Sequence, residues 1–362
     1  MFVVTNRTLN SGGTGLKKFG DRPNPQGPNE LRLVEASRSS HGWDVKILPD
    51  ECTQTMKRSA GLEPDQPAFA SAYVAKKLLA RVRKQKRNVL FFVHGYNNNM
   101  KAVLDRAHEL ERTYDVEVIA FSWPANGGGA RGVASYLSDK ADARASAGAL
   151  SRCLAKLHEY LDTFNRERLA AVYAKADALY GPESKGKHKD DFERRDEYIS
   201  THSERGCPFT VNLMLHSMGN YLYKQVMCSS AYQGRLLTFD NVVMVAADTN
   251  NANHASWVDP IRARNRVYVT INESDRALRA SRIKSGQEQL ARLGHFPFNL
   301  YAESAVYVDF TDARYVGSSH AYFEGGPLQN NKVRRFFAEA FNGDRAERRL
   351  DYESATNTYR IA

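Results

Sequence analysis

The chain has 362 residues, 42% of them hydrophobic and 25% charged, and its formal net charge at pH 7 is +10. This length allows one large domain or two ordinary ones, and the composition is that of a globular rather than a disordered chain. No hydrophobic run approaches the roughly 20 residues that a membrane helix needs, and the first residues lack a signal-peptide core. We therefore expect a cytoplasmic protein without a membrane span.

The positive charge is spread along the chain, and its densest run, KQKR at 84–87, is typical of a solvated helix end. A nucleic-acid partner is not expected, because basic and aromatic residues do not combine into a recognisable binding module. The four cysteines are scattered without a CxxC pair, which argues against disulfides and zinc. No helix has paired ligands such as H-x-x-x-H, so we expect neither a metal nor another cofactor.

The N-terminal region, residues 1–60, is predicted to form short strands and loops. It contains an expected edge strand at 1–7, a loop with three prolines at 21–28, and two pairing strands at 31–36 and 43–48. The turn between the two pairing strands is placed at 37–42.

From residue 68 onward, expected helices and strands alternate. The run NVLFFV at 88–93 is continuously hydrophobic, as is typical of a parallel strand covered on both faces. Further strands are expected at 116–121, 209–215, 241–247, 266–271 and 305–310, and helices at 68–84, 101–114, 138–161, 218–229 and 331–341. The alternation predicts an α/β sandwich with a mostly parallel central sheet and helices on both faces. We expect the whole chain, 1–362, to form one such domain.

Residues 164–206 interrupt this alternation. They are rich in charge and contain GPESKGK at 181–187, which predicts two helical pieces around a flexible break. The segment is an insertion before the strand at 209–215, and it either caps the functional site or decorates the surface. The last residues, 343–362, are expected to form a polar tail.

The strongest chemical signal is the segment NLMLHSMGN at 212–220. A hydrophobic strand runs directly into Ser217 and a helix begins directly after it, which is the context of a nucleophile elbow. Gly219 stands two residues after the serine, as the pattern G-x-S-x-G requires, whereas Leu215 replaces the first glycine. The alternative is a serine that caps the N-terminus of the helix. We interpret Ser217 as the nucleophile of a hydrolytic reaction.

A second signal is VHGYNNN at 93–99, where a hydrophobic strand ends in a loop of glycine and asparagine. Backbone N–H groups of such a loop can stabilise the oxyanion of a tetrahedral intermediate. We assign this role to Tyr96, together with Met218 at the start of the helix. His94 is interpreted as a packed, hydrogen-bonded residue rather than as a base. Trp123 either packs in the core or forms the wall of an acyl pocket, and the substrate pocket is assigned to His94, Gly95, Trp123 and His216.

The general base is assigned to His320, in the loop between the last expected strand and the last expected helix. Two aspartates could orient its imidazole. Asp275 follows the strand at 266–271, and Asp248 follows the strand at 241–247. Either keeps the chain order of serine, acid and histidine. The later strand is the usual place for the acid, which favours Asp275, although Asp275 is also well placed to cap a helix.

Taken together, these residues resemble the α/β-hydrolases, and within them a bacterial group of α/β-hydrolase domains of unknown function. The matching pieces lie at about 88–323 and are FVHGYN at 92–97, FSWP at 121–124, LHSMGN at 215–220, AAD at 246–248, DRAL at 275–278 and HAYF at 320–323, with Tyr136, Asp139 or Asp142, and Ser146 of the long helix. The resemblance implies a serine nucleophile and no particular substrate. Leu215 and the insertion at 164–206 depart from the pattern.

The sequence favours an esterase or lipase that cleaves a carboxylic ester of a small or lipid-like molecule with a Ser-His-Asp triad. A thioesterase or amidase with the same triad is an alternative, and so is a catalytically silent binding protein, because a fold alone does not define a function. The oligomeric state is left open.

Overall fold

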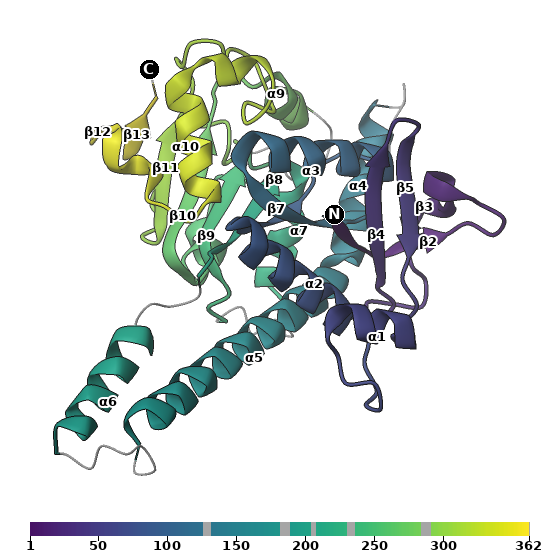
Figure 1. Cartoon of the computed structure of the whole chain (residues 1–362). Coiled ribbons are helices and arrows are strands. Elements are labelled where there is room, and N and C mark those ends of the chain that lie inside the picture. Colours follow the sequence, from purple (N-terminus) through teal and green to yellow (C-terminus); the bar gives the residue numbers. More distant parts are fainter. Residues whose placement is uncertain (126–131, 182–188, 204–207, 230–235, 284–290, 362) are drawn as a thin grey trace.

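The computed structural model describes residues 1–361 except 126–131, 182–188, 204–207, 230–235 and 284–290. Its centre is an 11-stranded sheet, most of which is parallel (Figure 1). The parallel strands, in their order across the sheet, are β13 (Thr358–Arg360), β11 (Ala305–Asp309), β10 (Ala263–Ile271), β9 (Phe239–Val245), β8 (Val211–His216), β6 (Asn88–Val93), β7 (Val116–Ser122) and β1 (Phe2–Thr5).

Antiparallel strands extend the sheet at both edges. On one side β4 (Arg32–Ser39) pairs with β1 and with β5 (Gly42–Ile47), which confirms the predicted hairpin. The predicted edge strand at 1–7 was wrong in its position, because β1 lies between β7 and β4 inside the sheet. On the other side β12 (Asp351–Glu353) pairs with β13, so residues after 343 add two strands to the sheet instead of forming a loose tail. A separate small sheet joins β2 (Arg7–Leu9) and β3 (Phe19–Pro23).

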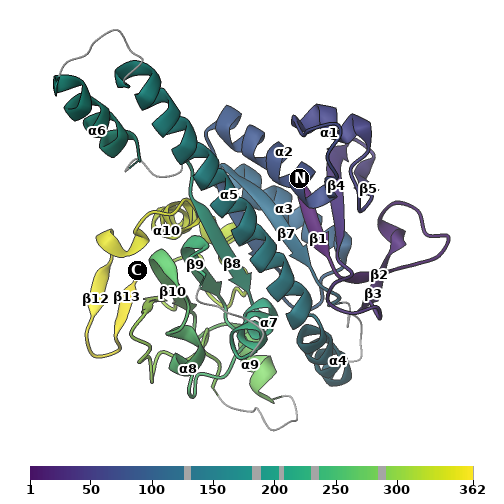
Figure 2. The same ribbon diagram turned by 90° about the horizontal axis from the view of Figure 1, so that it is seen from below.

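Helices cover both faces of the sheet, as the alternation predicted (Figure 2). One face is covered by α2 (Ala70–Gln85), α4 (Gly132–Ala145), α5 (Ala147–Tyr180), α7 (Met218–Met227) and α8 (Ala255–Val258). The other is covered by α3 (Met100–Tyr114), α9 (Arg276–Ile283) and α10 (Asn331–Phe341). A short helix, α1 (Gln54–Ala60), packs beside α2, and the 3₁₀ turns are η1 (Gly15–Lys18), η2 (Gly326–Gln329) and η3 (Ala346–Arg349).

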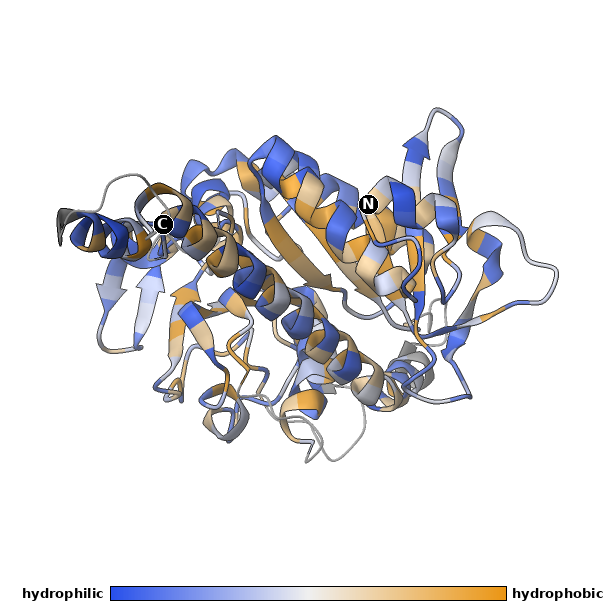
Figure 3. Ribbon diagram, turned by 60° about the horizontal axis from the view of Figure 1, so that its bottom comes forward, coloured by the Kyte–Doolittle hydropathy of each residue, from blue (hydrophilic) through white to orange (hydrophobic). Residues whose placement is uncertain are grey.

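The central strands consist mainly of hydrophobic residues (Figure 3). Their side chains are buried on both sides, because each face of the sheet meets a helical layer. In β6, Phe91 belongs to the cluster beneath α2 and α5, whereas its neighbours Leu90 and Phe92 belong to the cluster beneath α3 and α10. All three side chains are at most 1% exposed. This two-sided burial fixes the register of β6 and β8, and therefore the place where the loops after them meet.

The predicted helix at 138–161 is two helices that meet at Ser146, whose hydroxyl donates to the carbonyl of Asp142 at 2.7 Å. The second, α5, continues through half of the insertion and is followed by α6 (Lys189–Ser203). The expected break at 181–187 lies, except for Gly181, outside the described residues. Figure 2 shows α6 and the C-terminal part of α5 projecting beyond the sheet. This arm precedes β8, whereas Ser217 follows it, about 20 Å away along the strand. The described part of this arm therefore joins β8 at the end of the strand opposite to Ser217.

Candidate active site

Ser217 occupies the turn between β8 and α7 in a strained backbone conformation, with φ 54° and ψ −122°. A non-glycine residue in such a region costs roughly 1–3 kcal/mol and persists only where the surroundings impose it. Here the Ser217 N–H donates to the carbonyl of Val245 at 3.0 Å, and the Asp248 N–H donates to the carbonyl of Ser217 at 3.2 Å. The buried Asn220 amide donates to the carbonyls of Leu215 and Ser217, each at 3.1 Å. The turn is thus held from both sides.

Two glycines allow the loop after β6 to lie directly against this turn. A Cβ atom on Gly95 would stand 2.7 Å from the Cβ of Ser217, and one on Gly219 would stand 2.7 Å from the carbonyl oxygen of Val93. Both distances are shorter than side chains tolerate, so neither position accepts a larger residue without movement of the backbone. Leu215, which replaces the first elbow glycine, is instead fully buried in the core beneath α7.

His320 and Asp275 form a hydrogen-bonded pair. The Nδ1 atom of His320 lies 2.7 Å from Oδ2 of Asp275, and Asp275 is fully buried while His320 is one-quarter exposed. The other oxygen, Oδ1, accepts hydrogen bonds from the N–H groups of Ala277 and Leu278 at 2.9 and 3.0 Å. Asp275 therefore accepts hydrogen bonds from the first turn of α9 with one oxygen and contacts the imidazole with the other, so one side chain makes both kinds of contact.

Asn272, at the end of β10, fastens the loop that carries His320. Its amide donates to the carbonyls of Gly317 and Ser319 at 2.9 and 3.0 Å, and its side chain is fully buried. The same residue's Oδ1 accepts from the N–H of Ser274, one residue before Asp275. Asn272 thus connects both halves of the pair. Sequence reasoning missed this role, and the only signal was a polar residue directly after a buried strand.

His216 joins the pair to the serine turn. Its Nε2 donates to the carbonyl of His320 at 3.1 Å, and the two imidazole rings lie 4.9 Å apart. The residue that precedes Ser217 therefore contacts the backbone of His320. Burial, followed by the neighbouring charge of His320, lowers the pKa of His216 well below its usual value, so His216 is neutral at physiological pH.

Asp248, the alternative acid, has other partners. Its Oδ1 lies 3.1 Å from Nε of Arg292, and its Oδ2 accepts from the hydroxyl of Tyr136 at 2.9 Å. Asp248 is 3% and Arg292 is 2% exposed. The Arg292 Nε–H itself donates to the hydroxyl of Ser281 at 3.0 Å, so the contact with Asp248 is an ion pair rather than an aligned hydrogen bond. The structure places Asp248 beside the serine turn but in a salt bridge away from His320.

The loop with Tyr96 is braced by a buried arginine that the sequence did not single out. Arg7 is 1% exposed, and its Nη2 donates to the carbonyl of Asn98 at 2.6 Å while its Nε donates to the hydroxyl of Ser122 at 2.9 Å. Burial lowers the pKa of Arg7 to about 10, which leaves it charged. The Asn98 amide in turn donates to the carbonyl of Tyr96 at 2.7 Å. Across from this loop, Met218 begins α7, and its N–H donates to no group in the described part of the chain.

His94 and Trp123 are fully buried and lie against each other. Their rings are stacked at 5.3 Å, the Trp123 N–H donates to Nε2 of His94 at 3.2 Å, and the indole donates to the His94 carbonyl at 2.9 Å. Since Nε2 accepts, Nδ1 carries the proton and donates to the carbonyl of Gly95. This burial agrees with the packing interpretation of both residues rather than with pocket walls.

The buried His94 makes stability depend on pH. Burial, reinforced by the charge of Arg7, lowers the pKa of His94 to about 3 from the usual 6.5. Between these values the unfolded chain binds a proton that the folded chain does not, so the free energy of unfolding falls as the pH is lowered below 6.5. Between pH 7 and 5, we expect a loss of about 2 kcal/mol from this residue.

Urea unfolding at both pH values checks this expectation. His94→Gln should be less stable than wild type at pH 7 but should lose about 2 kcal/mol less between pH 7 and 5. His41→Gln, at an exposed histidine, serves as the control and should keep the wild-type dependence. Equal pH dependence in all three proteins would contradict the assignment.

The described residues contain no group of three or more histidine, cysteine, aspartate or glutamate side chains arranged to hold a metal ion. Within the same residues, no helix has the length and hydrophobicity to cross a membrane. Of the four cysteines, Cys52, Cys153 and Cys228 are free, and Cys207 lies outside the described residues.

A mostly parallel sheet, covered by helices on both faces and carrying a serine at a tight turn from strand to helix, defines the fold of an α/β hydrolase. A family model described as "Alpha/beta hydrolase of unknown function (DUF900)" matches residues 70–165 and 175–311, and the chain belongs to this family. Ser217 and Asp275 lie within the matched residues, and His320 lies after them. Comparisons with curated proteins and with solved structures give no match.

Proposed function

We propose that this protein is a serine hydrolase that cleaves a carboxylic ester of a small or lipid-like molecule through an acyl-enzyme. The observation that carries the proposal is the 2.7 Å hydrogen bond between Asp275 and His320, whose backbone contacts the residue before Ser217. A buried carboxylate on Nδ1 fixes the tautomer in which Nε2 of the imidazole is free to accept a proton.

In this mechanism the Ser217 hydroxyl attacks the ester carbonyl while His320 takes its proton. The tetrahedral oxyanion is stabilised by the N–H groups of Met218 and Tyr96, which the helix N-terminus and the braced loop supply. Collapse of the intermediate expels the alcohol, to which His320 returns the proton, and leaves an acyl group on Ser217. Water, activated by His320 in the same way, then releases the carboxylic acid and restores the serine.

The test is pre-steady-state hydrolysis of p-nitrophenyl acetate, butyrate and decanoate, with the matching thioesters and anilides as comparison. An acyl-enzyme predicts a burst of p-nitrophenol with one equivalent per protein, followed by slower turnover, and the burst is absent in Ser217→Ala. Faster turnover of the thioesters or anilides would assign the same triad to a thioesterase or an amidase. The absence of a burst and of turnover with every substrate would favour a binding protein on this fold.

A further inference from the structure

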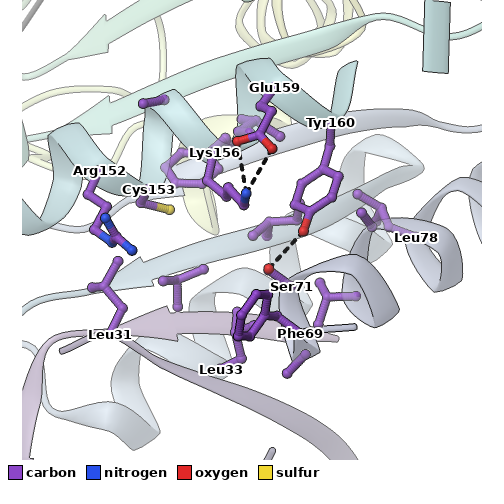
Figure 4. Close-up of a pocket in the computed structure, with 18 of the residues that line it drawn as sticks. Leu31, Leu33, Phe69, Ser71, Leu78, Arg152, Cys153, Lys156, Glu159 and Tyr160 are labelled. Carbon is purple, nitrogen blue, oxygen red and sulfur yellow. Dashed lines mark hydrogen bonds and ion pairs between the residues drawn. The ribbon is translucent and has the colours of Figure 1, made fainter. Parts of the chain in front are cut away.

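A long apolar groove lies between α2 and α5, with a volume of about 650 Å³ (Figure 4). Its floor is the sheet, and its walls are the two helices. The residues of α5 that line it run from Arg152 to Phe164, which lie about 18 Å apart along the helix. The floor consists of Val4, Val89, Phe91, Ile119 and Val211, and the walls include Leu78, Leu79, Cys153, Leu157 and Leu161.

The groove is separate from the candidate active site. Its floor includes Val211, the first residue of β8, whereas Ser217 follows the last residue of the same strand, about 20 Å away. The reacting end of an ester at Ser217 would therefore lie at the opposite ends of the strands from the groove.

The deepest residues of the groove are nearly closed to solvent. Val89 and Phe91 on its floor are each 1% exposed, and Leu79 on its wall is 8% exposed, so an occupant would contact mainly the half-buried wall residues, such as Leu78, Leu157 and Leu161. An α-helix of a partner, about 10–12 Å across with its side chains, is too wide to enter between two helices that contact each other. Two polar contacts also cross between the helices: the Ser71 and Tyr160 hydroxyls lie 2.8 Å apart, and Lys76 lies 3.1 Å from Glu167. The space fits a single extended hydrocarbon chain better than a helix.

The charges at the mouth differ in their pairing. Arg32 lies 2.9 Å from Glu30 and 3.9 Å from Asp50, and Lys156 lies 2.8 Å from Glu159, so both have partners. Arg152 is exposed, lines the groove beside Leu31 (Figure 4), and forms no ion pair with any described residue. An apolar slot with an unpaired guanidinium at one end is complementary to a hydrocarbon chain with an anionic head.

We propose that this groove binds a single-chain anionic amphiphile of the fatty-acid class, with its carboxylate at Arg152 and its chain running between α2 and α5 toward Phe164. Such a molecule has the chemistry of the acid that ester cleavage would release. Binding at the groove nevertheless does not depend on the reaction at Ser217, and the two are tested by different readouts.

The experiment measures the binding of dodecanoate to the full chain carrying Ser217→Ala, by displacement of a dansyl-labelled undecanoic acid. We expect octanoate, decanoate and dodecanoate to bind with increasing affinity, by about fourfold for each methylene group buried. Dodecanol should bind more weakly than dodecanoate. Failure of dodecanoate to displace the probe at millimolar concentration would overturn the proposal, whatever the hydrolytic activity of the wild type.

Substitutions in the groove test whether dodecanoate binds there. Arg152→Ala should weaken dodecanoate by about three- to fivefold, the range of an exposed charge pair, and leave dodecanol unchanged. Arg166→Ala, on the same helix but paired with Asp162 outside the groove, is the matched control and should have no effect. Ala75→Phe should fill the groove and abolish binding of both molecules, and Leu157→Trp, at a half-buried position on the opposite wall, is the second filling variant if Ala75→Phe unfolds.

Equal effects of the two arginine variants, or undiminished binding after filling of the groove, would overturn the proposal. So would a dimer in sedimentation velocity that dissociates on filling of the groove without any binding of dodecanoate, because the groove would then be an interface between copies of the chain.

Discussion

Replacing Ser217 by alanine is expected to lower kcat for ester hydrolysis by about 10⁶, and replacing His320 by alanine is expected to lower it by a similar factor. In the proposed mechanism the hydroxyl forms the covalent bond and the imidazole moves its proton, so neither group acts without the other. The double variant should therefore be no slower than either single variant. The effects are measured as steady-state kcat with the best p-nitrophenyl ester.

Ser318→Ala is the matched control for this experiment. Ser318 lies in the same loop as His320, its side chain is exposed, and its hydroxyl makes no hydrogen bond with the described residues. The Ser318→Ala variant should hydrolyse the ester at the wild-type rate. If the fold reductions in kcat of the two single variants multiply in the double variant, Ser217 and His320 act independently. That result would contradict the proposed triad.

The second large effect distinguishes Asp275 from Asp248 as the residue that orients the imidazole of His320. In Asp275→Asn, the side-chain oxygen can still cap α9, since asparagine is as good a cap as aspartate. The amide nitrogen, a donor, then takes the place of the carboxylate oxygen that lies 2.7 Å from Nδ1 of His320 in the wild type. Two donors would face each other. The imidazole would change to the tautomer with a proton on Nε2, which cannot accept one from Ser217. We expect kcat to fall by about 10⁴ with little change in stability.

Asp248→Asn should lower stability strongly and kcat only a little, the opposite of Asp275→Asn. It removes the charge opposite Arg292, a guanidinium that is 2% exposed, and breaking a buried ion pair costs about 3–5 kcal/mol. Urea unfolding should show this loss, while kcat of the folded fraction should fall far less than in Asp275→Asn. If Asp248→Asn instead keeps its stability and loses more activity than Asp275→Asn, the acid has been assigned to the wrong residue.

The fold was largely predictable because local patterns carry it. The continuous hydrophobic strand at 88–93 and the helix that follows residue 217 each show their type in a short segment. The predictions were wrong where pairing with a distant strand determines the structure of a segment. Residues 2–5 form an inner strand only because the hairpin of β4 and β5 pairs outside them. The last residues form β12 and β13 because the free edge of β11 accepts them, although their own sequence is polar.

The candidate site was predictable to the extent that its residues follow strands. Ser217 and Asp275 lie shortly after β8 and β10, and His320 lies in the loop between β11 and α10, so chain order alone could nominate them as candidates. The proposed preference for Asp275 over Asp248 rests on the side-chain contacts, since both residues follow parallel strands. The supporting residues Arg7 and Asn272 could not be found in this way, because they act through carbonyls of loops that are distant in the sequence.

Labelling of the purified full chain with a fluorophosphonate tests the central assignment most directly. We expect one label per protein, located by mass spectrometry on the peptide that contains Ser217. The label should be absent in Ser217→Ala and should form much more slowly in His320→Ala. A folded wild-type protein that takes up no label, or a label that persists in Ser217→Ala, would contradict the assignment of Ser217 as the nucleophile.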